Sequence, residues 1–163
     1  MVKEIISRNG GQVILVDDED YLWLGGYKWY IDPNGYAYRR QQRVKDKQVH
    51  IYMHREIAQK VMGIEGNIDH IDGDKSNNQK DNLREANKSQ NGANRRPNKN
   101  SRSKYKGVTW CNRDQKHRAR ITLNGKGETI GYYDVEEDAA RAYDKKALEL
   151  FEEFAYFNFP EEH

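Results

Sequence analysis

The stretch DHIDGDKSNNQKDNL, residues 69–83, continues as REANKSQN to Asn91 and is the most informative run of the sequence. Asp, Asn and His dominate this stretch, and it holds too few apolar residues to build a hydrophobic core. Such a segment is more typical of a chemical site than of a scaffold. Asn87, followed three residues later by Gln90, resembles a capping box, so a helix should begin near Asn87 and carry Asn91 in its opening turns. Gly92 weakens that helix.

The run resembles the HNH, or ββα-metal, endonucleases, and in particular their homing branch, in which Asp-His opens the finger and two asparagines follow. On this resemblance Asp69 and His70 match the opening pair, Asn82 matches the middle asparagine, and Asn91 matches the closing metal ligand. The spacings are twelve residues from His70 to Asn82 and nine from Asn82 to Asn91. The resemblance implies a first strand that carries Asp69 and His70, and a second strand over about residues 82–86.

The chemistry of phosphodiester hydrolysis agrees with these residues. The reaction needs a base that deprotonates water and a cation that neutralises charge on the departing 3′ oxygen. An imidazole with an ordinary pKa of about 6.5 suits the first task, so His70 is the predicted general base. Asp69 and Asn91 offer hard oxygen ligands, which favour Mg²⁺ or Mn²⁺ over zinc. Asn82 is expected to orient the finger and to hold His70 in position.

Alternatives apply to several of these positions. Many HNH enzymes carry His where this chain has Asn91, so the metal preference is less defined than the reaction. Asp72 and Asp74 place side-chain oxygens at every second position, as the ligands of a calcium loop do. Such a loop also needs a bidentate Glu at position twelve, and position twelve counted from Asp72 is Leu83. His54, in MHREI, is either structural or a residue that supports the finger or approaches DNA. Cys111 is the single cysteine, which excludes an internal disulfide and a paired-cysteine zinc site.

Charge is distributed unevenly along the chain, although the formal net charge is only +2. Residues 1–90 hold 14 basic and 14 acidic side chains, residues 91–126 hold 11 and 1, and residues 127–163 hold 3 and 11. A block as basic as the middle segment is typical of a phosphate-binding surface, because an ordinary solvated surface mixes the two signs. Double-stranded DNA is therefore the expected partner.

The first sixty residues are expected to form a β-rich lead-in. QVILV is a short apolar strand, and GYAYRRQQ and VHIYM carry strand-like residues near the turn PNG. HREIAQKVMG predicts a short helix that ends at Gly63. No stretch approaches the roughly eighteen apolar residues of a membrane span, and the N-terminus lacks the apolar run of a signal peptide. The protein is therefore expected to act in the cytoplasm of a prokaryotic host cell, away from membranes.

The C-terminal part of the chain predicts three strands and a helix. The strands are YKGVTW, HRARITL and ETIGYYD, with the turn Asn124-Gly125 between the second and third, and the helix covers about residues 136–151. Alternation in the second strand separates Arg118, Arg120 and Thr122 on one face from Ala119, Ile121 and Leu123 on the other. The helix carries an apolar stripe made of Ala139, Ala140, Tyr143, Ala147 and Leu150.

Residues 104–160 resemble the plant ethylene-response-factor, or APETALA-type, DNA-binding domain in YKGVTW, RARITLNGK, IGYYD, EEDAARAYDKKAL and FNFP. The resemblance implies a three-stranded sheet, backed by one helix, that lies in the major groove. Arg118 and Arg120 are expected to read guanine, because a guanidinium can bond both acceptors of its major-groove edge. His117 is a further candidate phosphate contact, and Trp110 either packs or stacks on sugar. The predicted DNA-facing residues are Arg95, Arg96, Lys104, Lys106, Trp110, Lys116, Arg118, Arg120 and Lys126.

These segments together predict an α+β protein, in which a ββα-metal HNH finger with a β-rich N-terminal lead-in precedes a three-stranded antiparallel sheet packed on one helix. The expected domains are residues 1–96, with the finger at 66–96, then a basic linker at 97–103 and a DNA-binding domain at 104–163. The predicted activity is metal-dependent, site-specific cleavage of double-stranded DNA, as in a homing endonuclease of a phage or bacterial mobile element. The alternative is a transcription-factor-like DNA binder with an inactive finger, against which the intact motif argues. The sequence predicts no oligomeric state.

Overall fold

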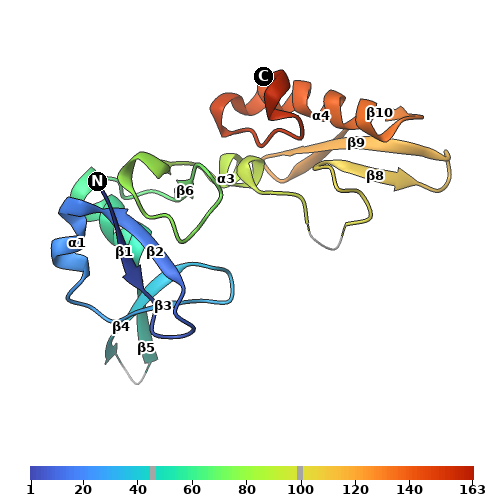
Figure 1. Ribbon diagram of the computed structural model, residues 1–163. Coiled ribbons are helices and arrows are strands. Elements are labelled where there is room, and N and C mark those ends of the chain that lie inside the picture. The colour runs from blue at the N-terminus through green and yellow to red at the C-terminus, as the bar shows by residue number, and fades with distance from the viewer. Residues whose placement is uncertain (45–46, 99–100) are drawn as a thin grey trace. The chain divides into compact units, whose positions relative to one another are not determined.

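The computed structural model describes residues 1–44, 47–98 and 101–163, so two positions of the predicted linker, 99 and 100, lie outside it. The described chain forms two compact units, Met1–Ala86 with three small antiparallel sheets and Asn87–His163 with one, and both contain helices (Figure 1). The predicted α+β class is confirmed. The first unit ends at Ala86, whereas the sequence predicts a boundary at residue 96. No helix in the described ranges is long and apolar enough to cross a membrane.

The first unit begins with a β-hairpin followed by a short helix. Strands β1 (Val2–Ile6) and β2 (Val13–Asp17) pair in antiparallel register, and β2 contains most of the predicted QVILV strand. Helix α1 (Asp18–Leu24) follows directly and carries three acidic residues in its first turn, where the helix dipole favours negative charge. Neither β1 nor α1 is predicted by the sequence pattern, because each is too short to show a clear period.

A three-stranded antiparallel sheet and a helix follow in the first unit. Strands β3 (Trp29–Ile31), β4 (Ala37–Val44) and β5 (Lys47–Tyr52) lie in the order β3-β4-β5. Helix α2 (Met53–Ile57) continues into the wider turn η1 (Ala58–Met62). The turn ends at Gly63, whose φ of 69° lies in the left-handed region that glycine adopts without strain. The predicted strands around PNG and the helix ending at Gly63 are therefore confirmed.

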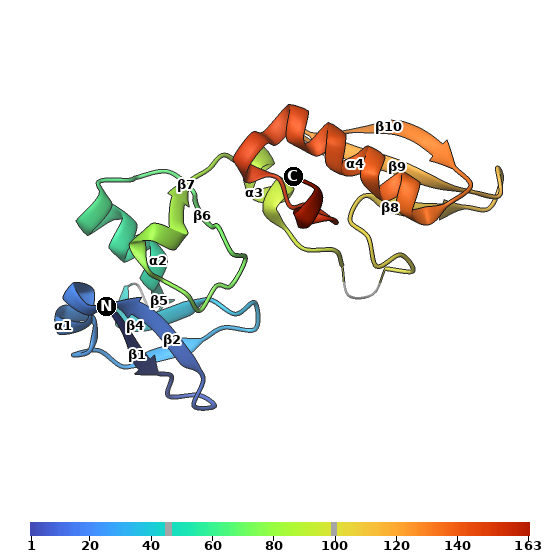
Figure 2. The same ribbon diagram turned by 45° about the horizontal axis from the view of Figure 1, so that its top comes forward.

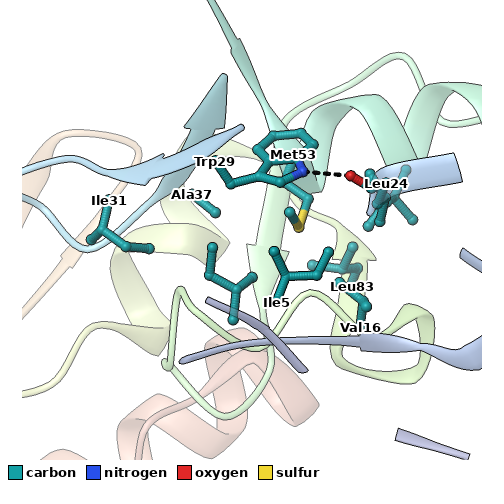
Figure 3. Close-up of a cluster of buried hydrophobic side chains, with 10 residues drawn as sticks. Ile5, Val16, Leu24, Trp29, Ile31, Ala37, Met53 and Leu83 are labelled. Atoms are coloured by element: carbon teal, nitrogen blue, oxygen red, sulfur yellow. Dashed lines mark hydrogen bonds between the residues drawn. The ribbon is translucent and has the colours of Figure 1, made fainter. Parts of the chain in front are cut away.

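The polar stretch forms a minimal hairpin that is attached to the core of the first unit. Strands β6 (Ile68–His70) and β7 (Leu83–Glu85) pair across a long loop that closes with the 3₁₀ turn η2 (Lys80–Asn82). Leu83 of β7 is buried in a cluster with side chains from β1, β2, β3, β4, α1 and α2 (Figure 3). The indole Nε1 of Trp29 donates to the carbonyl of Leu24 at 2.9 Å, so the largest core side chain is also held by a hydrogen bond. The buried members of this cluster are Ile5, Ile14, Val16, Leu24, Trp29, Ile31, Ala37, Met53, Ile57 and Leu83.

The second unit contains the predicted sheet and helix. Strands β8 (Val108–Cys111), β9 (Lys116–Leu123) and β10 (Lys126–Tyr133) form an antiparallel sheet in the order β10-β9-β8. Helix α4 (Glu136–Phe151) covers one face of this sheet (Figure 2), and the chain ends in the 3₁₀ turns η3 (Glu152–Phe154) and η4 (Pro160–Glu162).

Burial in the second unit follows the predicted alternation along β9. Ala119 and Ile121 are buried with the small side chains of α4, while Arg120 and Thr122 are exposed. Leu123, predicted on the packed face, is 37% exposed instead, because it ends the strand at the Asn124-Gly125 turn. Both turn residues have positive φ angles, as a tight hairpin turn requires.

Helix α3 (Lys88–Asn94) packs within the second unit. Ala93 is buried in a cluster with Ile121, Tyr143, Ala147 and Phe151. The carbonyl of Ala93 also accepts a hydrogen bond from the backbone N–H of Tyr156 at 3.0 Å. These contacts explain why the division of the chain falls before α3 and not after it.

Candidate active site

The hairpin β6–β7 carries the predicted catalytic pair. Asp69 and His70 are adjacent on β6 and are both buried, with 7% and 4% of their surface exposed. The ladder places Asp69 opposite Arg84 and His70 opposite Leu83. The predicted first strand is therefore confirmed, and the second strand lies within the predicted residues 82–86.

A guanidinium fixes the carboxylate of Asp69. Arg84 donates to Asp69 Oδ2 from Nε at 3.1 Å and from Nη2 at 2.9 Å, and both side chains are largely buried. Both donors reach the same oxygen, so the contact fixes the position of Oδ2. Sequence reasoning did not single out Arg84, although its cross-strand position follows once the register of the hairpin is known.

His70 lies in an environment that favours the neutral imidazole. Burial lowers the pKa of His70 below its ordinary value, although the Asn78 amide and three nearby carboxylates act in the opposite direction. A neutral imidazole can accept a proton from water, which is the task predicted for this residue. The structure is therefore compatible with His70 as a general base.

His54 packs against the candidate base. The two imidazole rings lie 5.2 Å apart between centroids and are nearly perpendicular, and the ring of Tyr36 lies 5.1 Å from that of His54. Burial, together with His70 and Arg55, lowers the pKa of His54 to about 3. Within the described part of the chain, His54 Nδ1 has no hydrogen-bond partner. His54 is thus a neutral ring beside His70, and its supporting role stays a prediction.

Asn82 organises the loop between the two strands. Its Nδ2 donates to the carbonyl of Asn77 at 2.8 Å and to Asp72 Oδ1 at 3.0 Å, and its Oδ1 accepts from the backbone N–H of Asp72 at 3.0 Å. These three hydrogen bonds tie both ends of the loop to one buried side chain. Asn82 therefore acts on the loop around the site, and any effect on His70 is indirect.

Asn78 is a site residue that sequence reasoning missed. It is fully buried, and its Nδ2 donates to the carbonyl of Ser76 at 3.0 Å, which leaves Oδ1 without a hydrogen-bond partner among the residues described. Its backbone N–H donates to the carbonyl of Leu15 at 2.8 Å, and Leu15 N–H donates to the carbonyl of Ser76 at 2.9 Å. Strand β2 therefore holds in place the loop that carries Asn78. Composition alone makes Asn77 and Asn78 look like equivalent turn residues.

Asn91, the second predicted metal ligand, lies on α3 in the second unit. The predicted capping box is confirmed: Asn87 Oδ1 accepts from the backbone N–H groups of Ser89 and Gln90 at 2.9 Å, and Gln90 Oε1 accepts from Asn87 N–H at 2.8 Å. Asn91 follows in the first turns of the helix and is half-buried. Asn91 and Asp69 belong to different units of the chain, and their joint role as ligands stays a prediction.

The predicted ligands are oxygen atoms of a carboxylate and an amide, and such ligands suit a hard divalent ion that also binds water or phosphate. Across residues 1–44, 47–98 and 101–163, no three His, Cys, Asp or Glu side chains form a group that could hold a metal. A divalent ion held by the Asp69 carboxylate would take further oxygen ligands, such as water and phosphate. Mg²⁺ commonly binds in this way, whereas a structural zinc site needs a full set of protein ligands.

The predicted DNA-facing residues of the second unit lie in different settings. Arg120 is exposed on the open face of β9 and lies against Gly127, where a larger residue would clash with its guanidinium. Arg118 lies on the same face, with Nη2 at 3.4 Å from Thr109 Oγ1. Trp110 is 40% exposed and packs edge-on against His117, with the centroids 4.8 Å apart. Trp110 and His117 pair on the side of the sheet that also carries Val108 and Ala119, so the open face carries the two guanidinium groups without the indole.

Some of the remaining basic side chains form hydrogen bonds or ion pairs within the unit, and the others are exposed. Lys106 is half-buried and donates to the carbonyls of Gly92 and Ala93 at the end of α3. Lys116 forms an ion pair with Asp134 at 3.2 Å. The others, which are exposed, are Arg95, Arg96, Lys104 and Lys126.

Comparison with known proteins agrees with the site. Residues 51–93 match the model of the HNH endonuclease family. An uncharacterised HNH endonuclease of Acanthamoeba polyphaga mimivirus is 31% identical over 151 residues, which cover 93% of this chain and 77% of that protein. Protein 3.8 of Escherichia phage T7 is 36% identical over 90 residues, which cover 55% of this chain and 74% of that protein. No solved structure matches the chain.

The matched family residues include the Asp69–His70 pair, Asn82 and Asn91, and the mimivirus relative is similar over nearly the whole chain. An HNH nuclease hydrolyses phosphodiester bonds, which is the chemistry that a buried carboxylate beside a neutral imidazole can support. The chain belongs to the HNH endonuclease family and is a DNA nuclease.

Proposed function

We propose that the protein is a site-specific endonuclease of the homing type that cuts double-stranded DNA with one Mg²⁺ or Mn²⁺ ion. The observation that carries the proposal is the adjacent pair Asp69 and His70, in which Arg84 fixes the carboxylate and His54 packs against the imidazole. His70 takes a proton from the attacking water at its imidazole. Asp69, with Asn91, holds the divalent ion, which when bound neutralises charge on the departing oxygen. Arg84 and the Asn82 loop keep these groups in place.

The second unit is proposed to read the target sequence as an ethylene-response-factor-type module. Its three-stranded sheet has one face packed on α4 and one open face that carries Arg118 and Arg120. A sheet of this size fits the major groove, and a guanidinium there can bond two acceptors of guanine. The exposed Arg95 and Arg96 are proposed to contact phosphates. Both viral relatives favour a mobile or viral gene, and the proposed place of action is the cytoplasm of a prokaryotic host.

The proposed function is tested by cutting a pool of plasmids that contain random inserts. The purified full-length protein is incubated with Mg²⁺ or Mn²⁺, and the new DNA ends are sequenced. We expect one recurring sequence around the cut, because base contacts from a separate reading module select the site. Ends scattered over all sequences would contradict site-specific cleavage. No new ends with either metal would contradict the proposed metal-dependent activity.

Replacing Arg120 with alanine is expected to weaken binding to the preferred site by about 1–3 kcal/mol, because a bidentate guanine contact is worth about that much. Affinity for an unrelated duplex should change much less, since phosphate contacts carry the non-specific part of binding. Both affinities are measured by fluorescence anisotropy with EDTA present. The matched control is Arg141→Ala, which removes an exposed arginine from α4, the helix behind the sheet. Equal losses on both duplexes would remove Arg120 from base reading.

A further inference from the structure

The sheet β3-β4-β5 presents one face to the core and a different face outward. Trp29, Ile31 and Ala37 belong to the buried cluster of the first unit. The pairing register sets Tyr30 opposite Tyr38, Tyr38 opposite Tyr52, and Arg40 opposite His50. Residues directly opposite in a ladder lie on the same side of a sheet. The outward side, here called the tyrosine face, therefore consists of Tyr30, Tyr38, Arg40, His50 and Tyr52.

Ring contacts connect the tyrosine face to the candidate base without a break. Tyr38 lies 5.7 Å from Tyr30 and 6.3 Å from Tyr52 between ring centroids. Tyr52 lies 5.8 Å from His54, which in turn lies 5.2 Å from His70. A row of rings that begins on β3 thus continues to the buried candidate base, His70.

Cations lie over the rings of this surface. The guanidinium of Arg40 is 4.7 Å from the ring centre of Tyr30, and that of Arg55 is 5.8 Å from the ring centre of Tyr52. Both arginines are exposed, and neither forms an ion pair among the residues that the structure describes. The three strands, whose sequences are WYI, AYRRQQRV and KQVHIY, contain no Asp or Glu. The positive charge of this surface is therefore not neutralised by acidic side chains of the sheet.

We propose that the tyrosine face, with Arg55, binds the sugar–phosphate backbone of duplex DNA beside the bond that is cut. A guanidinium stacked on a ring keeps its N–H groups in a fixed plane, and this favours phosphate oxygens as partners. The cations already cover ring faces, so the rings serve to position the arginines and not to stack on unpaired bases. The surface lies in the first unit and is separate from the reading sheet of the second. The inference rests on the proposed function, because it takes DNA as the substrate at His70.

Binding of the full-length protein to two duplexes, the preferred site and an unrelated sequence, tests this face when EDTA prevents cleavage. The double variant Arg40→Ala with Arg55→Ala should bind both duplexes more weakly. It should also lower the slope of log affinity against log salt by about 1.8, or roughly 0.9 for each phosphate that the variant no longer binds. Tyr30→Leu should weaken binding because Arg40 loses its ring, whereas Tyr30→Phe keeps the ring and should bind as the natural protein does. The matched control, Lys3→Ala, removes an exposed cation from β1 and should leave the slope unchanged.

An unchanged slope in the double arginine variant, with its thermal unfolding also unchanged, would overturn the inference. A loss of affinity confined to single-stranded oligonucleotides would do the same, because it would indicate stacking on unpaired bases. Ethylation interference then locates the contact. In the natural protein, ethyl groups on phosphates next to the cut should block binding, and the double variant should be indifferent to them. Cleavage of plasmid DNA is measured separately from binding. If the protein cuts no DNA but its binding still depends on Arg40, the proposed nuclease function is contradicted. The inference that this face binds DNA is not.

Discussion

Replacing His70 with alanine is expected to reduce the rate of DNA cleavage by about 10²- to 10⁴-fold, because loss of a general base typically costs that much. Binding to the preferred duplex should change little, since the base acts in the chemical step. Both quantities are measured on the same DNA, with single-turnover cleavage for the rate. Because His70 is only 4% exposed, the variant contains a cavity of about the size of the lost ring. Free imidazole added to the buffer should therefore restore part of the rate.

The control for this experiment is His163→Ala, which removes an exposed histidine in the second unit. It should cleave as the natural protein does. Thermal unfolding of the His70 variant shows whether the hairpin still folds. A folded variant that cuts at more than about a tenth of the natural rate would remove His70 from the role of base.

Removal of the metal is expected to stop cleavage completely, and Mg²⁺ or Mn²⁺ should restore it. Asp69→Ala should abolish this rescue at any metal concentration, because it deletes the charged ligand proposed for the ion. The same change leaves the largely buried guanidinium of Arg84 without its carboxylate. An uncompensated buried charge typically costs about 3–5 kcal/mol of folding free energy, so unfolding of the single variant would also stop cleavage.

A second variant separates these two effects. Asp69→Ala combined with Arg84→Met removes both charges of the pair and replaces the guanidinium with an apolar side chain of similar length. We expect the double variant to unfold at a higher temperature than Asp69→Ala and still to show no metal-dependent cleavage. Full rescue of the folded double variant by Mg²⁺ would show that Asp69 is not a ligand.

The hairpin and its catalytic pair could be predicted because they depend on short-range spacing. Asp69, His70 and Asn82 lie where the motif places them, and the capping box at Asn87 depends on residues three apart. Asn78 and Arg84 could not be found in this way. The first depends on a loop that docks on β2 more than sixty positions earlier in the chain, and the second depends on the register of the β6–β7 ladder.

The second sheet was predictable for a similar reason, since alternation along β9 is a local pattern. The tyrosine face was not, because Tyr30, Tyr38 and Tyr52 come from three separate strands. In the sequence they are ordinary tyrosines, and only the pairing of the strands makes them neighbours. The basic block at residues 91–126 predicts one phosphate-binding surface. The balanced charge of residues 1–90 gives no comparable signal for the arginines of the tyrosine face, which is proposed as a second one.

The packing of α3 has a consequence for hybrid enzymes. A chimera joined within residues 97–103 would take Ala93 away from its native partners Tyr143 and Phe151, and so would expose apolar surface in both halves. A crossover just before Asn87 would keep that cluster intact. Natural recombination just before Asn87 would transfer Asn91 together with the sheet that is proposed to read the target sequence. A gene that acquires a new target preference in this way would inherit one end of its nuclease motif from the donor, and the Asp69 hairpin from the recipient.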